Sequence, residues 1–415
     1  MINGSSLFFY KELILMVKDN LDFTLVEDLL NKTQEEVKKM NPVNVMIVGK
    51  TGVGKSTLVN NVFRERLAST GIGKPITKHL RKIAKEGIPI VLYDTRGLEL
   101  SESVQSDVRA EVFGALKTNR EKGPEEAIHV IYYCINANSS RIEESEIQFI
   151  NELTEEVPVI IVLTQSIGKP AEDFKQYIEK LHLDIVSVLT IMAEPFVISE
   201  ELVIPRKGLK ELIALTFEVI PEDVQKAFNN AQQVDIERKA QAARRWAMRY
   251  VTTTFGVGFT PIPFSDATLL VPMQITMMAH ITAIFGISMD RTNIASILGA
   301  VGGTSGATYL GRYIVSNLIK LIPGAGTIAG GIISGGTASV LTSALAMSYI
   351  EVLAFIAKRE VTGETPDLQE ISELMKEKLQ EQLKKSKLKA SNERKNKKEN
   401  IIQRMISRFK NTQRK

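Results

Sequence analysis

The stretch that most constrains this chain runs from Asn44 to Asn60 and reads NVMIVGKTGVGKSTLVN, which contains the spacing G-x-x-x-x-G-K-[ST]. The apolar run before the first glycine predicts a buried strand, and the residues after the last glycine predict a helix. Glycines in such a loop let backbone N–H groups turn inward, toward the positive end of the following helix. The order of strand, glycine loop and helix therefore predicts a binding site for a phosphate chain.

The side chains of this loop have distinct expected roles. Lys55 is expected to neutralise the outer phosphates, which makes it a catalytic candidate as well as a ligand. The Ser56 hydroxyl is expected to complete the shell of a Mg²⁺ ion that keeps water and phosphate oxygens as its other ligands. The predicted phosphate-binding residues are Gly49, Lys50, Thr51, Gly52, Val53, Gly54, Lys55, Ser56 and Thr57.

A second motif ends the apolar run IPIVLYDTRG, where Asp94 and Gly97 form an Asp-x-x-Gly turn. Such turns are common, so an ordinary connection is one interpretation. In a protein with a phosphate-binding loop, however, an aspartate at the end of a neighbouring strand reaches the magnesium shell, and the glycine amide contacts the terminal phosphate. The position of the motif, one buried strand after the loop, favours these roles for Asp94 and Gly97.

Apolar runs alternate with helical segments from residue 43 to about residue 220, which is typical of an α/β fold with a mostly parallel sheet. The predicted strands are 44–48, 88–94, 127–135, 157–164 and 194–199, with an edge strand at 79–84. Helices are predicted at 102–118, 141–155 and 207–219, with Ser101 and either Ser139 or Ser140 as caps.

At these motifs the chain resembles the small GTPases of translation-factor type, and specifically their Era-like and immunity-related branch, whose loops read GKTGVGKST. The resemblance covers residues 43–220 and implies a Ras-like domain that binds GTP with Mg²⁺ and hydrolyses it to GDP and phosphate. It also implies that Thr77, in GIGKPITK, is the switch threonine that closes over Mg²⁺ and the γ-phosphate. From its composition alone, the segment 66–78 is equally typical of an ordinary loop.

Two positions depart from the family pattern. The guanine-binding motif Asn/Thr-Lys-x-Asp aligns with Thr164, Gln165, Ser166 and Ile167, so the aspartate that pairs with the guanine N–H groups is missing. Thr164 and Gln165 are still expected to support the loop and flank the base, and Ser199 resembles the serine of the last base-binding loop. GTP is thus implied by the resemblance, and ATP stays open as the alternative.

The second departure is Leu98, which stands where many small GTPases carry a glutamine that orients the attacking water. Slow hydrolysis is therefore expected, raised by self-association (a homo-oligomer) or by an activating partner. Arg96 is a candidate arginine finger, although a solvated role is the common alternative. A protein that binds nucleotide as a membrane scaffold without turnover is the competing hypothesis.

The amino-acid composition changes in the C-terminal half of the chain. Pro221 is expected to open a linker helix over 221–250. Between residues 267 and 350 only four residues are charged, and they separate uncharged runs of 23, 20 and 30 residues, each long enough to span a bilayer. Membrane helices and a soluble helical bundle with Gly-rich turns both fit. The segment VGFTPIPFSDATLLVPMQITMMAHITAIFG resembles the start of a helical domain of uncharacterised function that follows such GTPase domains in bacterial proteins and is regarded as membrane-associated.

The charge distribution and the cysteine content indicate where in the cell this protein acts. Residues 384–415 carry thirteen Lys or Arg against two Glu, although the whole chain has a net charge of only +4. With Ile401, Ile402, Met405, Ile406 and Phe409 on one helical face, this tail is typical of a segment on an anionic membrane surface, and nucleic acid is the weaker alternative. The single cysteine, Cys134, and the absence of a signal-peptide pattern favour a cytoplasmic protein associated peripherally or integrally with the membrane.

These observations predict five regions: a helical lead-in (1–40), the nucleotide-binding domain (41–220), the linker helix (221–250), an apolar Gly-rich helical domain (251–360), and an amphipathic and basic tail (361–415).

Overall fold

The structure, a computed structural model, describes residues 23–70, 72–95, 102–255, 267–287, 289–302 and 335–386. The chain forms two compact units. The nucleotide-binding unit consists of Gln34–Lys239 with Ala283–Gly286, and the helical unit takes Met1–Thr33, Ala240–Thr282 and Ile287–Lys415.

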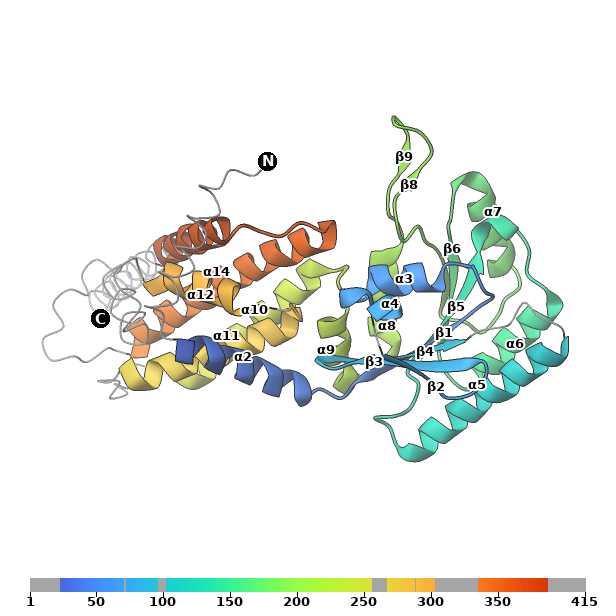
Figure 1. Ribbon diagram of the computed structural model, residues 1–415, viewed down its shortest axis with the longest axis horizontal. Helices are drawn as coiled ribbons and strands as arrows, with labels where there is room; N and C mark the ends of the chain where they lie inside the picture. Colours follow the sequence, from blue (N-terminus) through green and yellow to red (C-terminus); the bar gives the residue numbers. More distant parts are fainter. Residues whose placement is uncertain are drawn as a thin grey trace, which may run out of the picture. The chain divides into compact units, whose positions relative to one another are not determined.

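The nucleotide-binding unit is built on a seven-stranded sheet with the order β2-β3-β4-β1-β5-β6-β7 (Figure 1). Its parallel part consists of β1 (Val43–Val48), β4 (Ile88–Thr95), β5 (Val130–Asn136), β6 (Val159–Thr164) and β7 (Ser187–Thr190). Antiparallel β3 (Leu80–Lys85) and β2 (Ile72–Pro75) extend it at one side. β1 and β6 are buried along their whole length, as the continuous apolar runs of central parallel strands require.

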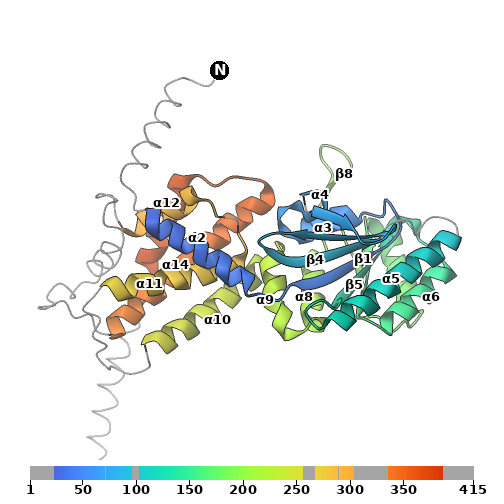
Figure 2. The same cartoon turned by 60° about the horizontal axis from the view of Figure 1, so that its bottom comes forward.

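Helices cover both faces of this sheet (Figures 1 and 2). One core packs the sheet against α3 (Lys55–Val62), α8 (Leu209–Val219) and α9 (Glu222–Ala231). The other core packs it against α5 (Glu102–Lys122), α6 (Glu144–Thr154) and α7 (Gly168–Glu179). The predicted α/β fold with a mostly parallel sheet is confirmed. The short elements η1 (Arg64–Arg66) and α4 (Leu67–Thr70) follow α3, and η2 (Ala137–Ser139) follows β5.

Three local predictions were wrong. The last sheet strand is β7 and not 194–199, where β8 (Phe196–Val197) instead pairs with β9 (Val203–Ile204) in a separate hairpin. β3 lies inside the sheet, because β2 forms beyond it in the segment expected to be a loop. The cap of α6 is neither Ser139 nor Ser140 but Glu143, which forms a reciprocal capping box with Glu146.

The predicted linker helix over 221–250 is also corrected, because it is two helices, α9 and α10 (Ile236–Phe255). The Gln232 side-chain oxygen accepts hydrogen bonds from the N–H groups of Val234 and Asp235, both at 2.8 Å, and the Asp235 carboxylate accepts one from Arg238 N at 2.9 Å. These side-chain bonds compete with the helical ladder and start a new helix.

The helical unit contains most of α10, α11 (Ala267–Phe285), α12 (Arg291–Gly302), α14 (Gly335–Thr362), a helix over 368–386, and the beginning of α2 (Phe23–Lys38). An all-helical C-terminal region was predicted, and this is confirmed over the residues that the structure describes there. Buried polar contacts join its helices: the hydroxyls of Thr282 and Tyr349 are 2.6 Å apart, and the Trp246 ring stacks on His280 at 3.8 Å.

One helical segment in the described part of the chain, Ala338–Thr362, is long and apolar enough to cross a membrane, with a mean hydropathy of 1.9. Most of its apolar window, 72%, is buried inside the protein, as in the core helix of a soluble bundle. The other Gly-rich runs, in 303–334, and the basic tail from residue 387 lie outside the described residues.

Candidate nucleotide-binding site

The phosphate-binding loop joins β1 to α3 and depends on three glycines with left-handed backbone angles. The φ angles are +149° at Gly49, +78° at Gly52 and +97° at Gly54. A Cβ atom on Gly49 would lie 2.4 Å from the carbonyl oxygen of Cys134 on β5, so no larger residue fits there. The loop is therefore held against the end of the neighbouring strand.

Lys55 lies within the curve of this loop. Its Nζ donates hydrogen bonds to the carbonyl oxygens of Gly49 at 2.6 Å and Lys50 at 2.9 Å. Because Gly54 caps α3 with its backbone alone, the first N–H groups of the helix are left for a ligand. A cation and helix N–H groups thus converge on one loop, as binding a phosphate chain requires.

The side chain of Lys50 has a different role from that of Lys55. Its Nζ pairs with Glu143 Oε1 at 3.0 Å and with Glu146 Oε2 at 3.1 Å, the two residues of the α6 capping box. Burial lowers the pKa of Lys50, but its hydrogen bonds to both carboxylates outweigh burial and raise the pKa overall. Lys50 therefore anchors the loop to α6, which leaves its backbone as the part predicted to bind phosphate.

Asp94 is the penultimate residue of β4, directly beside the strand that leads into the loop, and pairs in register with Ile47. The neighbouring Thr95 is buried and donates its hydroxyl to Ile47 O at 3.2 Å, which fixes the end of β4. Asp94 Oδ2 pairs with Arg81 Nη2 of β3 at 3.4 Å. The structure thus places the predicted magnesium carboxylate beside the loop, with a guanidinium as its partner.

Thr77 lies in the turn between β2 and β3, where its hydroxyl bonds to the Glu111 carboxylate of α5. His79 N donates to the same carboxylate oxygen at 2.9 Å. Both contacts tie Thr77 to α5, and its predicted role as a magnesium ligand and catalytic residue stays a prediction.

At the base end, Thr164 ties the predicted base-binding loop to the phosphate-binding loop. Its buried hydroxyl contacts the carbonyl oxygen of Val53 and lies 3.1 Å from that of Ile135. Gln165 has a positive φ of 53°, and its side-chain and backbone oxygens accept hydrogen bonds from Asn136 at 3.4 Å and Asn138 at 3.2 Å. The predicted supporting roles of Thr164 and Gln165 therefore have a geometric basis.

Ile167 occupies the N-cap of α7 and makes no side-chain cap hydrogen bond. An aspartate here would have served both as a helix cap and as the guanine ligand. Its replacement leaves an apolar side chain where the family pattern places a carboxylate.

The sequence did not reveal which segment lies beside the predicted base-binding loop. Ser199 is in the turn of the β8–β9 hairpin, where its N–H donates to Leu202 O at 3.2 Å. The residue that contacts the base-binding loop is Ile191, whose carbonyl accepts a hydrogen bond from Ser166 N at 3.1 Å. Glu194, which follows closely, accepts a hydrogen bond from Asn61 of α3 at 3.0 Å. Residues 191–194 are thus a candidate base-binding segment, and Ser199 remains a prediction.

The three predicted magnesium ligands, Ser56, Thr77 and Asp94, offer only oxygen atoms, which Mg²⁺ prefers, and water and phosphate would supply the rest. Of these, Asp94 lies beside the strand that leads into the loop, whereas Thr77 is bonded to Glu111. Across the part of the chain that the structure describes, no group of three or more His, Cys, Asp or Glu residues could hold a metal ion by itself. Arg96, Gly97 and Leu98 lie outside the described residues.

Comparison with known proteins agrees with this geometry. Residues 44–165 match the model of the family described as 50S ribosome-binding GTPase. Residues 223–388 match the model of a domain of unknown function, DUF697. The chain thus resembles a GTPase family over part of its α/β unit and the DUF697 family over its C-terminal helices.

Individual relatives match only parts of this chain. The neuronal-specific septin-3 of Danio rerio is 26% identical over 187 residues, which are 38% of this chain and 50% of that protein. The tRNA modification GTPase MnmE of Malacoplasma penetrans is 36% identical over 90 residues, 20% of each chain. A crystal structure of a probable GTP-binding protein engB aligns with a TM-score of 0.32 and 15% identity, covering 43% of this chain and 98% of that one. The chain spans half the length of the septin relative and a fifth of MnmE.

Proposed function

We propose that this protein is a slow, magnesium-dependent GTPase switch of the Era-like type, whose nucleotide state is passed to a membrane-associating helical domain. The observation that carries the proposal is the phosphate-binding loop, in which Lys55 and the start of α3 converge inside a glycine curve. The match of residues 44–165 to a GTPase family model supports GTP as the nucleotide.

In this proposal a water molecule attacks the γ-phosphate in line with the leaving GDP oxygen. Lys55 and the loop N–H groups stabilise the negative charge that develops on the phosphate oxygens. When bound, Mg²⁺ adds positive charge beside Ser56, Asp94 and Thr77. Leucine at position 98 cannot orient the water, so turnover is slow and rises with an activating partner or on self-association.

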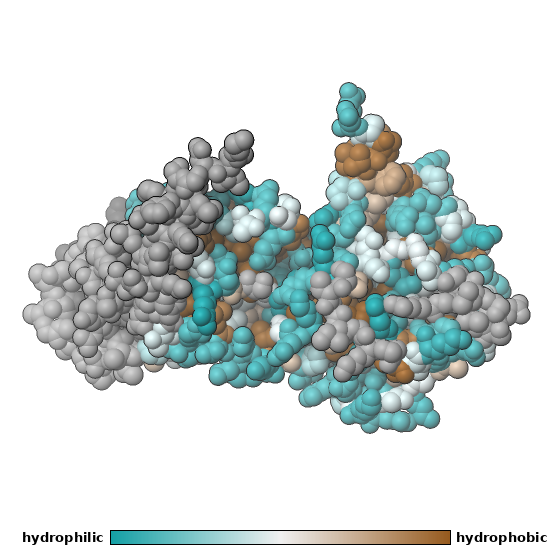
Figure 3. Space-filling model, in the orientation of Figure 1, coloured by the Kyte–Doolittle hydropathy of each residue, from teal (hydrophilic) through white to brown (hydrophobic). Residues whose placement is uncertain are grey.

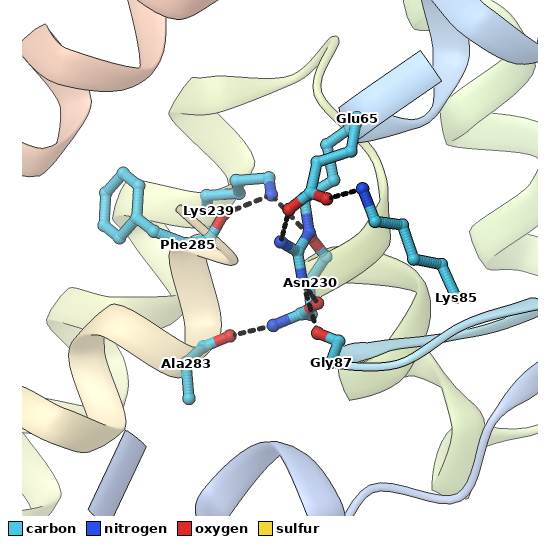
Figure 4. A network of polar contacts seen from close by, with 8 residues as sticks. Glu65, Lys85, Gly87, Asn230, Lys239, Ala283 and Phe285 are labelled. Carbon is cyan, nitrogen blue, oxygen red and sulfur yellow. Dashed lines mark hydrogen bonds and ion pairs between the residues drawn. The ribbon is translucent and has the colours of Figure 1, made fainter. Parts of the chain in front are cut away.

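A network of polar contacts connects the residues after α3 with the helices that follow the nucleotide-binding domain (Figure 4). α3 starts at Lys55, and directly after its end Glu65 and Arg66 have left-handed φ angles of 63° and 46°. Arg64 in this bend donates to Gly87 O and to Asn230 Oδ1 of α9, both at 2.8 Å. Glu65 pairs with Lys85 of β3. A shift of α3 would thus reach the turn between β3 and β4 and helix α9 directly.

Lys239 continues this network into α10 and α11. It is 2% exposed, and its Nζ donates to Asn230 O at 3.0 Å and to Phe285 O at 2.6 Å, near the carboxyl ends of α9 and α11. Asn230 also donates to Ala283 O at 2.5 Å. A buried cation at two helix C-termini is a strong electrostatic tie. Both α10 and α11 run on into the helical unit, which makes them the proposed transmission elements.

The membrane part of the proposal is supported by the basic, amphipathic sequence of the tail. An anionic membrane surface is the proposed partner, and the cytoplasmic side of that membrane is the proposed location.

Two other functions have a specific observation in their favour. A nucleotide-binding membrane scaffold without turnover is favoured by Leu98. An ATPase is favoured by Ile167, because the missing carboxylate removes the main physical reason to prefer guanine.

The test is steady-state phosphate release by the full chain with GTP or ATP and Mg²⁺, with and without vesicles of anionic phospholipid. The switch requires slow GTP turnover that the vesicles change. Lys239→Met, which keeps the length of the side chain without its charge, should keep basal GTP turnover and lose the vesicle response. Absence of turnover under all conditions would favour the scaffold, and faster turnover of ATP than of GTP would favour the ATPase.

A further inference from the structure

The turn between β2 and β3 is closed by hydrogen bonds that involve both the backbone and the side chain of Thr77. The N–H groups of Ile76 and Thr77 donate to Leu80 O, at 2.9 Å and 3.2 Å. In the opposite direction, Leu80 N donates to the Thr77 hydroxyl oxygen at 3.2 Å. The Thr77 side chain is therefore part of the turn, and a change in its direction breaks a hydrogen bond there.

A single carboxylate, that of Glu111 on α5, holds this turn. Its Oε2 atom accepts a hydrogen bond from the Thr77 hydroxyl and a second one from His79 N, the latter at 2.9 Å. A threonine hydroxyl has only one proton to donate, and here Glu111 receives it. Because the acceptor is an ionised carboxylate, these bonds are stronger than bonds between neutral groups.

Helix α5 is a firm support for this carboxylate. Val108 and Val112, which lie close to Glu111 along the helix, are fully buried in the core that α5 forms with the sheet. In the chain, α5 also follows β4, the strand that carries Asp94. Glu111 thus ties the turn of Thr77 to the helix that comes after another predicted magnesium ligand.

The two faces of the sheet set the direction in which Glu111 holds Thr77. α5 packs on one face, whereas α3, which carries Ser56 in its first turn, packs on the other. The bond to Glu111 therefore draws the Thr77 hydroxyl toward the α5 face. This bond has to break before Thr77 can share a magnesium ion with Ser56.

We propose that Glu111 is a positioning residue, which holds Thr77 on α5 until a nucleotide with a γ-phosphate draws it away. The inference rests on the proposed function, because it takes Thr77 as the residue that closes over the γ-phosphate. A ligand shifts an equilibrium between two states only by its difference in affinity for them. The contact with Glu111 therefore weakens binding of GTP and leaves binding of GDP unchanged.

Equilibrium binding of nucleotides to the full chain tests this difference. Glu111→Ala should raise the affinity for a non-hydrolysable GTP analogue with Mg²⁺ by about tenfold and leave the affinity for GDP within about twofold. Glu121→Ala, which removes an exposed carboxylate of the same helix, is the matched control and should change neither affinity. Exposed apolar side chains gather on the β8–β9 hairpin of this unit (Figure 3), so every sample contains the same mild detergent to prevent association.

Hydrogen exchange in the absence of nucleotide tests the contact by itself. The His79 amide is bonded to Glu111, and the Leu80 amide is bonded to the Thr77 hydroxyl. Glu111→Ala should therefore speed amide exchange at His79 at least about fivefold. In a Thr77→Val background, which has no hydroxyl to hold, Glu111→Ala should no longer change the affinity for the GTP analogue. Retained binding of GDP shows that each variant is folded.

Three outcomes overturn the inference while the proposed function stands: unchanged exchange at His79 in Glu111→Ala, an equal change in the affinities for GDP and the GTP analogue, or weaker binding of the analogue. The last result would mean that Glu111 supports the closed position of Thr77. If the wild-type chain binds neither nucleotide, the proposed function fails, and this inference fails with it.

Discussion

The two ends of the candidate nucleotide site differ in how closely they follow the pattern that their chemistry requires. At the phosphate end, the glycine conformations, Lys55 and Asp94 all lie where phosphate and magnesium binding need them. At the base end, Thr164 fixes the loop, but Ile167 replaces the carboxylate, and residues 191–194 stand where a serine-containing loop was expected. We therefore expect nucleotide affinity to depend mainly on the phosphate end, and base selectivity to be the property most open to change.

The largest effect should come from Lys55→Ala. Removal of the cation inside the loop should lower the affinity for Mg-GTP by about 100-fold, since charge-assisted bonds to phosphate are among the strongest in the site. Equilibrium binding of a fluorescent GTP analogue to the full chain measures this. Lys117→Ala, on the exposed face of α5, is the matched control and should bind normally. An unchanged affinity of the Lys55 variant would show that the loop does not hold the phosphates.

The second-largest effect should be on the preference for guanine over adenine. Ile167→Asp should raise the ratio of GTP to ATP affinity by about 30-fold, because the new carboxylate accepts both guanine N–H groups and finds no such pair on adenine. Both nucleotides should be titrated competitively against the same fluorescent ligand.

Ile167→Asn separates base recognition from folding. Asparagine caps α7 about as well as aspartate, so both variants gain similar helix stability, but it lacks the carboxylate. A gain in GTP preference shared equally by both variants would mean that the helix cap, and not the carboxylate, caused it.

This contrast also explains what the sequence could predict. The phosphate end was predictable because its chemistry lies in one contiguous segment, where glycine, lysine and serine have few other reasons to occur at that spacing. The base end depends on two segments, 164–167 and 191–194, which α7 and β7 separate in the sequence. The short strand Ser187–Thr190 carries a weaker pattern than the exposed run FVIS, so apolar content placed the last strand in the wrong segment.

Contacts between segments that are distant in the sequence could not be predicted from it. Lys239 is charged and sits in a segment with the composition of a solvent face, yet it is buried because Asn230 and Phe285 present carbonyl groups from two other helices. The break between α9 and α10 arises from one glutamine side chain, Gln232, which accepts two backbone hydrogen bonds where propensity favoured a continuous helix.

A smaller effect is expected for magnesium binding at the phosphate end. The Arg81 guanidinium pairs with Asp94 and so competes with a divalent cation for the same carboxylate. Arg81→Gln should lower the Mg²⁺ concentration needed for half-maximal GTP binding by about fivefold, a modest change because the pair is partly exposed. Lys82→Gln, whose lysine pairs with Glu126, is the control on the same strand. A higher magnesium requirement in the Arg81 variant would mean that the guanidinium orients Asp94 for the ion.

The smallest effect is a pH dependence of stability that belongs to the phosphate end. Burial raises the pKa of Cys134 to about 12, from 9.0, directly behind Gly49. Above pH 9 the unfolded chain loses the thiol proton while the folded chain keeps it, so the contribution of Cys134 to stability is complete below pH 9 and falls as pH rises toward 12. Between pH 8 and pH 9.5 the free energy of unfolding should drop by about 0.8 kcal/mol on this account. Urea unfolding of the full chain should show this loss, and Cys134→Ala should reduce the total loss by this amount. Burial also raises the pKa of several tyrosines, which add a loss in the same direction to both proteins, so an identical slope in the two over this window would show that the thiol is not held in its neutral form.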